Sequence, residues 1–213
     1  MISSKFTEIK GYYGYAYYSG DDITDEMIEQ CFALDNQFFK EEYLYNVEKV
    51  RRWLQNHKQM CSVLYSKERN EVIAYCFYLF ISDEALQLFK ENKISFFTLG
   101  ESLLEQPKKG DKLNMFCLSD ACKPGWDFVQ THRIMNEYNV LNLCKMARDL
   151  SVFVKTVCID SVCEYDETLV KQFHISEFVK TNHNTKFYWG KFDPSVTWTY
   201  CVYWQTLVDL YTK

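Results

Sequence analysis

The sequence predicts a mixed α/β (α+β) protein with a mostly antiparallel sheet and one central parallel strand–helix–strand unit. Runs rich in β-branched and aromatic residues alternate with polar turns, as strands do. Residues 128–150 carry apolar side chains at a spacing of three or four, which is typical of a long helix. A strand is expected on each side of that helix, and a crossover of this length usually joins parallel strands.

The first third of the chain predicts one irregular strand and two helices. Residues 6–18 are rich in tyrosine and contain Gly11 and Gly14, which favours a bulged strand. Thr24 is expected to cap the first helix and Asn46 the second. The apolar face of the first helix is expected to carry Ile28, Cys31, Leu34 and Phe38.

The middle of the chain predicts a hairpin, an insertion and the parallel unit. The β-forming runs CSVLY and EVIAYCFYLFI are joined by the polar turn SKERN. Ser82 opens a short helix that carries Leu86 and Phe89 and begins an inserted excursion at about 82–112. Its residues 91–112 are predicted to lie at the surface because glycine, proline and the run KKGDK interrupt them. KLNMFCLSD and VFVKTVCI are the predicted parallel strands. The apolar face of the helix between them is expected to carry Ile134, Tyr138, Leu141, Cys144 and Ala147.

The last part of the chain predicts one helix and two aromatic strands. Asp166 is expected to cap a helix that runs to Phe173. TKFYWGKF and TWTYCVYW then predict two strands around a turn at Asp193 and Pro194.

Composition favours a single domain over residues 1–213, since 213 residues contain only 7 Gly and 3 Pro. The net charge is −5 with acids and bases spread along the chain, so no nucleic-acid or anionic-lipid partner is expected. No apolar run is long enough to span a bilayer, and MISSKFTEIKG lacks the apolar core of a secretory signal. A cytoplasmic protein without a membrane partner is therefore expected, while the sequence leaves the oligomeric state open.

The nine cysteines are expected to be reduced core residues, because most lie in apolar runs and no export signal precedes them. Cys117 and Cys122 have four residues between them, as do Cys158 and Cys163. This gap is wider than the two-residue gap common in zinc knuckles, so no metal site is expected.

In the order of its elements the chain resembles the GNAT family of acyl-CoA-dependent N-acetyltransferases, with the best local match over residues 114–178. In that family a glycine-rich loop, Q/R-x-x-G-x-G/A, leads from the central strand into the long helix and binds pyrophosphate. Here the segment is LSDACKPGWDFVQTHRIMNEYNVLNL; KPGW looks like the turn, but no paired glycines follow. Thr131, His132 and Arg133 can supply side-chain donors to phosphates at the helix start, and a solvated first turn is the alternative.

The resemblance also implies the other site residues. Asp120, near the end of the central strand, is a candidate base and alternatively a capping or turn residue. Tyr165 is the nearest substitute for the family's thiolate-protonating tyrosine, whose place Phe173 takes, and it is alternatively a packing residue. Glu41 and Glu42 can attract a cationic amine or simply form a solvated pair. The resemblance implies that the pantetheine arm of acetyl-CoA, the co-substrate, pairs with the strand at Leu118, Ser119, Ala121 and Cys122.

The leading hypothesis is therefore an acyl-CoA-dependent N-acetyltransferase acting on an unidentified small-molecule or protein amine. The alternative is a catalytically silent GNAT-like domain that binds a ligand or a protein. A nucleophilic Cys122 has no partner that spacing identifies, and neither G-x-S-x-G nor a P-loop motif is present. The aromatic residues are expected in the core rather than stacked on bases.

Overall fold

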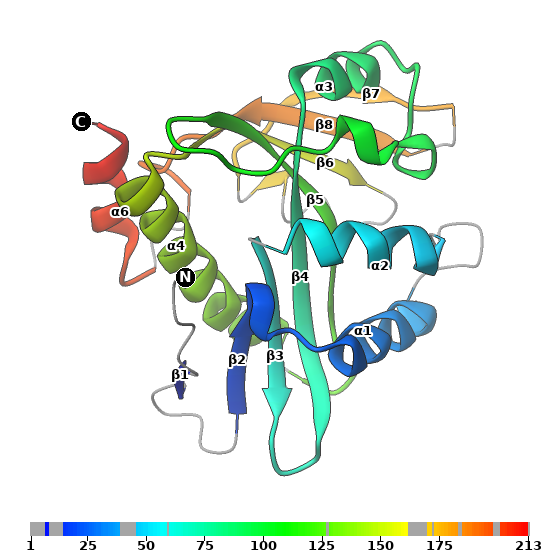
Figure 1. The fold of residues 1–213 in the computed structure, drawn as a ribbon, viewed down its shortest axis with the longest axis vertical. Coiled ribbons are helices and arrows are strands. Elements are labelled where there is room, and N and C mark those ends of the chain that lie inside the picture. The colour runs from blue at the N-terminus through cyan, green and yellow to red at the C-terminus, as the bar shows by residue number, and fades with distance from the viewer. Residues whose placement is uncertain are drawn as a thin grey trace. The chain divides into compact units, whose positions relative to one another are not determined.

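The computed structural model describes residues 7–8, 15–38, 46–58, 60–126, 128–161, 170–171, 173–182, 185–197 and 201–212. The chain divides into two compact units, which are described in turn. The first consists of Met1–Phe77 and Ser119–Asn139, and the second of Tyr78–Leu118 and Val140–Lys213. Two strands, β4 and β5, and one helix, α4, run from one unit into the other (Figure 1).

The helices and strands follow the predicted order up to the C-terminal part. The helices are α1 (Asp25–Phe38), α2 (Val47–Asn56), α3 (Asp83–Lys90), α4 (Phe128–Leu150) and α6 (Trp204–Tyr211), with 3-10 turns η1 (Gly20–Asp22), η3 (Phe96–Thr98) and η4 (Glu101–Leu103). The strands are β1 (Thr7–Glu8), β2 (Tyr15–Ser19), β3 (Met60–Ser66), β4 (Glu71–Ile81), β5 (Lys112–Cys122), β6 (Phe153–Ser161), β7 (Glu177–Lys180) and β8 (Lys186–Lys191). Their hydrogen-bonded order is β1-β2-β3-β4-β5-β6-β8-β7, in which β5–β6 is parallel and β1–β2, β2–β3, β6–β8 and β7–β8 are antiparallel. The predicted mixed, mostly antiparallel sheet is thus confirmed.

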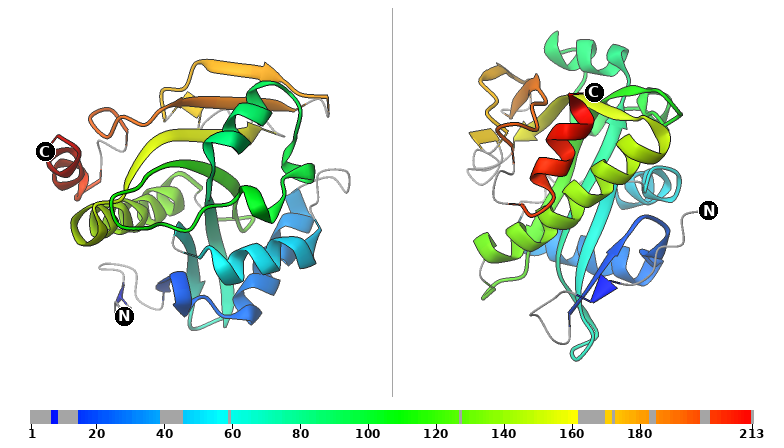
Figure 2. Two further views of the ribbon diagram at one scale, coloured as in Figure 1. Left: turned by 45° about the horizontal axis from the view of Figure 1, so that its top comes forward. Right: turned by 90° about the vertical axis from the view of Figure 1, so that its left-hand side faces the viewer.

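The helices α1 and α2 of the first unit are capped by the residues that the sequence predicts. Thr24 Oγ1 accepts a hydrogen bond from the backbone N–H three residues on at 3.2 Å, and Asn46 Oδ1 does the same at 2.9 Å. Such caps satisfy N–H groups that have no partner within the helix. Arg51 of α2 forms an ion pair with Glu29 of α1, and the two helices lie side by side (Figures 1 and 2).

Helices cover both faces of the sheet in the first unit. In β3, Cys61 interacts with Cys31 of α1, whereas the next residue, Ser62, donates a hydrogen bond of 3.0 Å to Asn139 of α4. Successive side chains of a strand point to opposite faces. Therefore α1 and the first half of α4 pack on opposite sides of β3, in agreement with the right-hand view of Figure 2.

In the second unit, the predicted parallel pair is confirmed. Lys112 of β5 is paired with Phe153 of β6, and the pairing continues to Cys117 and Ile159 with one register shift after Leu113. The connecting helix, α4, has the predicted bounds. A right-handed helical crossover is the common connection between such strands.

The predicted buried face of α4 is confirmed in part. Cys144 and Ala147 are buried as predicted, whereas Ile134, Tyr138 and Leu141 are half-buried. Among the described side chains of this helix, the buried polar ones are Thr131, Asn136 and Asn139. The spacing of apolar residues predicted the helix correctly, but it could not show that polar residues such as the two asparagines are buried.

The predicted excursion at residues 82–112 is partly core. Its helix, α3, begins as predicted, because Ser82 Oγ accepts a hydrogen bond from the N–H three residues on at 3.0 Å. Phe89, from α3, stacks on Phe116 with centroids 5.5 Å apart and on Phe187 with centroids 4.4 Å apart. Phe96, Leu99 and Leu104 are also buried. This segment therefore supplies part of the aromatic core of the second unit.

The C-terminal prediction is correct for one strand and wrong for the other. β8 lies within TKFYWGKF, but the described residues of TWTYCVYW are not in a strand: Thr197 and residues 201–203 are in turns, and α6 begins at Trp204. Residues 198–200 lie outside the described residues. The strand that pairs with β8 on the side away from β6 is β7, which the sequence analysis did not predict. Most of the helix expected from Asp166 also lies outside the described residues.

Candidate functional site

The parallel pairing of β5 with β6 stops before β5 ends. The last pair is Cys117 with Ile159, and β5 continues to Cys122. Asn114 to Phe116 are 0–1% exposed, whereas Cys117, the last paired residue, and Leu118 to Cys122, beyond the pairing, are 6–9% exposed. The end of β5 is thus buried. The four residues expected to contact a pantetheine arm, Leu118, Ser119, Ala121 and Cys122, all lie in this stretch.

A buried polar network in the first unit joins this strand end to α1 and β4. Tyr75 donates a hydrogen bond to Oδ1 of Asp35, and its oxygen lies 2.7 Å from Ser119 Oγ. Ser119 Oγ also donates to Asp35 Oδ1 at 3.2 Å. Asp35 and Tyr75 are 1% and 0% exposed, so the carboxylate is held by hydroxyl donors in a nearly dry environment. Such a network fixes the orientation of each hydroxyl.

Asp35 and Tyr75 were not predicted as site residues from the sequence. Asp35 follows Cys31 by four residues and so lies on the apolar stripe of α1, where an acid is unusual. An acid at that position was the signal in the sequence that could have identified Asp35 as a site residue. Tyr75 could not be distinguished from the other aromatic residues of EVIAYCFYLFI.

The candidate base, Asp120, follows Ser119 directly and is 7% exposed. Because neighbouring side chains of a strand alternate, Asp120 points to the face opposite the one that carries Ser119. A carboxylate at the end of a strand can accept a proton from a ligand that is bound there.

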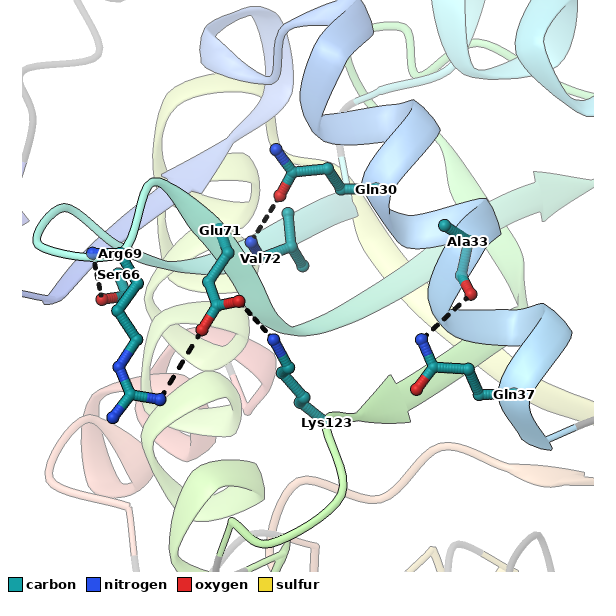
Figure 3. A network of polar contacts seen from close by, with 8 residues as sticks. All are labelled: Gln30, Ala33, Gln37, Ser66, Arg69, Glu71, Val72 and Lys123. Atoms are coloured by element: carbon teal, nitrogen blue, oxygen red, sulfur yellow. Dashed lines mark hydrogen bonds and ion pairs between the residues drawn. The ribbon is translucent and has the colours of Figure 1, made fainter.

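The turn after β5 is held by an ion-pair network in the first unit (Figure 3). Lys123 forms an ion pair with Glu71, whose other oxygen lies 3.8 Å from Arg69, and the Lys123 N–H donates to the carbonyl of Ile73 at 2.7 Å. Gly125 has a φ of +86°, which a residue with a side chain rarely adopts. The KPGW turn is therefore a defined structure anchored to the start of β4.

Trp126, the last residue of this turn, contacts two side chains of the first unit. Its ring meets Tyr15 edge to face at 5.2 Å, and the Arg69 guanidinium lies 5.9 Å from the ring centroid. Through these two contacts, the segment that leads into α4 packs against β2 and against the turn between β3 and β4.

The first residues of α4 include the three expected phosphate donors. Thr131 is buried at 4% exposure, and Arg133 is exposed. His132 is helical, but its side chain lies outside the described residues, as do Glu41, Glu42 and Tyr165 altogether. Within the described ranges, no cluster of three or more His, Cys, Asp or Glu side chains is arranged to hold a metal ion. No helix there is long and apolar enough to cross a membrane.

Eight cysteines lie among the described residues; all are buried, and none of them is in a disulfide. Burial raises the pKa of the Cys31, Cys144 and Cys158 thiols, and the Asp35 carboxylate raises that of Cys31 further. A raised pKa keeps the thiol protonated and unreactive near neutral pH. We expect only a few thiols to react with Ellman's reagent in native buffer, Cys122 first, as identified by mass spectrometry. Immediate reaction of most thiols would contradict this.

No protein-family model and no curated protein matches this sequence. Solved structures do. The loading GNATL domain of CurA from Lyngbya majuscula is similar with a TM-score of 0.57 at 12% identity, over 84% of this chain and 97% of that chain. The GNAT-like decarboxylase GphF in complex with isobutyryl-CoA has a TM-score of 0.54 at 11% identity, over 83% and 99%. A chain of the NatC complex bound to Gag peptide and CoA has a TM-score of 0.53 at 10% identity, over 82% and 95%.

These proteins carry different names on one architecture, so the likeness identifies the fold and not the reaction. It agrees with the sheet order, the single parallel pair and the long crossover helix. The chain described by these elements has the GNAT fold.

Proposed function

We propose that this protein binds an acyl-CoA and transfers the acyl group to an amine. The observation that carries the proposal is the end of β5, where five residues continue beyond the last pair with β6. Backbone groups at such a strand end can hydrogen-bond the amides of a pantetheine arm without requiring particular side chains. Two solved structures of similar fold hold CoA or isobutyryl-CoA, which supports the same class of ligand here.

In this proposal the start of α4 binds the CoA phosphates. A helix N-terminus favours anions through its N–H groups and dipole. Arg133 is exposed there and supplies a charge-assisted donor, with Thr131 and His132 beside it. These side chains take the place of the missing glycine loop.

Calorimetry with acetyl-CoA and with free CoA tests the cofactor. We expect both to bind the parent protein, and Arg133→Ala to weaken binding about tenfold, because one charge-assisted contact contributes roughly 1.5–3 kcal/mol. Arg148→Ala, which removes an exposed arginine at the other end of α4, is the control and should leave the affinity unchanged. Equal affinity in the parent and the Arg133 variant would refute the phosphate role.

The chemistry starts from an ammonium, which loses two protons on becoming an amide, and one proton must reach sulfur. In our proposal Asp120 takes the first proton from the ammonium, the amine nitrogen forms a bond to the thioester carbonyl carbon, and the carbon–sulfur bond breaks. Tyr165 gives a proton to the departing thiolate, and the second proton of the nitrogen passes to the resulting tyrosinate. Acetyl-CoA is the proposed acyl donor. A panel containing a polyamine, an aminoglycoside, a free amino acid and a lysine-containing peptide, with release of CoA thiol as readout, would identify the acceptor class.

Asp35 is a positioning residue in this scheme, since it acts through Tyr75 and Ser119. Asp35→Ala leaves two buried hydroxyls without their acceptor, so we expect the free energy of unfolding to fall by about 2 kcal/mol. Asp35→Asn keeps one acceptor oxygen and should cost about half as much. Urea denaturation measures both, with exposed Asn36→Ala as the control. Equal stability of the alanine variant and the parent would show that the network contributes nothing.

A second candidate is a silent GNAT-fold domain that binds a ligand or a protein. The ion pair of Lys123 with Glu71 favours this candidate, because the positive charge of the KPGW turn is neutralised by a carboxylate of the protein itself. A folded parent protein that binds neither acetyl-CoA nor CoA would support this candidate over the transferase.

A further inference from the structure

Strand β7 (Glu177–Lys180) is an edge strand of the sheet in the second unit (Figure 1). It comes last in the hydrogen-bonded order, and β8 is the strand that pairs with it among the described residues. Three of its four residues are exposed. The backbone N–H and C=O groups on the outer side of an edge strand are available to another chain in extended conformation.

The hydrogen bond next to β7 shows which of its backbone groups point outward. The N–H of Thr181, directly after the strand, donates to the carbonyl of Thr185 at 2.9 Å, and these two residues continue the register of the β7–β8 pairing. Hydrogen-bonded and non-bonded pairs alternate along an antiparallel ladder. Val179 is therefore bonded to β8, as Thr181 is to Thr185, whereas the N–H and C=O groups of Phe178 and Lys180 point away from β8.

The outer side of this edge ends at Asn182. The Asn182 N–H donates to Asn92 Oδ1 at 3.2 Å, and Asn182 Oδ1 accepts a hydrogen bond from Asn92 Nδ2 at 3.0 Å. Asn92, in the turn after α3, therefore occupies the backbone donor that would come next along the edge. Phe178 and Lys180 are the two positions of β7 at which an added strand can pair, since each supplies one N–H and one C=O group.

The side chains of these two residues combine an apolar ring with a positive charge. Phe178 and Lys180 point to the same face, because residues two apart in a strand do. Phe178 is 53% exposed, and Lys180 is exposed. Lys180 lies directly opposite Lys186 of β8, which is also exposed and whose ammonium group is 5.9 Å from the centroid of the Phe178 ring. Like charges directly opposite each other destabilise a sheet, so an acidic group beside Lys180 is stabilising there.

The acid of β7, Glu177, lies on the opposite face from these lysines. Its carboxylate accepts a hydrogen bond of 3.0 Å from Trp189 Nε1 on that face. A lysine on an edge opposes pairing with an apolar or basic strand. A second copy of β7 would bring further lysines to this edge, whereas an acidic segment brings the complementary charge.

We propose that the outer edge of β7 binds an extended acidic segment of a partner protein, which adds to the sheet as an antiparallel strand. The main chain of the segment pairs with Phe178 and Lys180. An acidic residue of the segment lies opposite Lys180, and an apolar residue two positions later lies opposite Phe178. The recognised pattern is therefore acid-x-apolar, and its recognition does not depend on acyl-CoA binding.

The test is fluorescence anisotropy of a labelled peptide, Thr-Glu-Thr-Val-Thr with a C-terminal amide, titrated with the full chain. We expect a Kd on the order of 10⁻⁴ M, since the pairing is short. Lysine in place of the peptide's glutamate should weaken binding about tenfold or more, because attraction to Lys180 becomes repulsion. N-methylation of the glutamate amide should also weaken it about tenfold, because it removes a main-chain donor that pairs with the edge. A methylated peptide that binds as well as the parent peptide would overturn strand addition.

A charge exchange assigns the binding to the edge of β7. Lys180→Glu should weaken the glutamate peptide about tenfold and strengthen the lysine peptide by a similar factor. Lys109→Glu, which changes an exposed lysine in the turn before β5, is the control and should leave both affinities unchanged. No binding of the glutamate peptide to the parent protein, or an unchanged preference in Lys180→Glu, would overturn the proposal. Sedimentation showing that the chain alone is a dimer whose stability Lys180→Glu alters would also overturn it, because the edge would then belong to a second copy.

Discussion

Replacing Asp120 with asparagine should lower the kcat of acyl transfer by about 10²–10⁴-fold, the usual contribution of a positioned general base. Asparagine has nearly the same shape but cannot take the proton from the ammonium of the acceptor. Asp120 is the acid of β5 and lies in the part of the strand beyond the last pair with β6, where it is 7% exposed. Affinity for acetyl-CoA should change little, because the proposed cofactor contacts there are made by the backbone.

The measurement is steady-state release of CoA thiol, with the amine that the parent protein turns over, as a function of pH. In the variant, the fall in kcat/KM toward acidic pH that a carboxylate base produces should disappear. Asp209→Asn, an exposed acid on α6, is the matched control and should behave as the parent. A variant with full kcat and an unaltered pH profile would exclude Asp120 as the base.

Local signals of the sequence predicted most of the elements. The cap residues Thr24, Asn46 and Ser82 each make the expected hydrogen bond, because a cap involves only a side chain and an N–H three residues away. The bounds of α4 were predicted from apolar residues that recur every three or four positions. Such features do not depend on the rest of the molecule.

The failures came where two local signals compete. The segment from Trp204 to Tyr211 follows a β-rich run, yet Trp204, Leu207 and Tyr211 also recur at helical spacing, and the helix is what forms. Aromatic residues suit either element, so packing decides: Tyr211 accepts a hydrogen bond from the Val154 N–H at 2.8 Å and meets Phe153 edge to face. Contacts of this kind, between residues more than fifty positions apart, are not visible in a local pattern.

The candidate site was predicted in part. Asp120 and the strand end follow from the element order, whereas Asp35 and Tyr75 depend on a contact between α1 and β4 that no motif encodes. A pattern of apolar residues cannot identify polar residues that are buried. Asn139 of α4 is a second example, since it is 0% exposed and accepts hydrogen bonds from Tyr17 and Ser62.

Phe116→Ala should have the largest effect on stability, because its side chain joins the inserted segment to the sheet of the second unit. Phe116 is 0% exposed, and its ring lies 5.5 Å from that of Phe89 and 6.4 Å from that of Phe96. Truncating a buried phenylalanine removes its transfer free energy and leaves a cavity, at a cost of about 3–5 kcal/mol.

The same truncation at the surface provides the control that separates packing from the loss of an aromatic ring. Phe178 of β7 is 53% exposed and touches Tyr188 and Lys186, so Phe178→Ala should cost about 1 kcal/mol or less. Denaturant unfolding of both variants gives the difference in free energy, provided that the m-values match that of the parent. If Phe116→Ala costs no more than Phe178→Ala, residues 82–112 do not pack on β5 as part of the core. The inserted segment would then be the surface excursion that its glycine, proline and charged residues suggest.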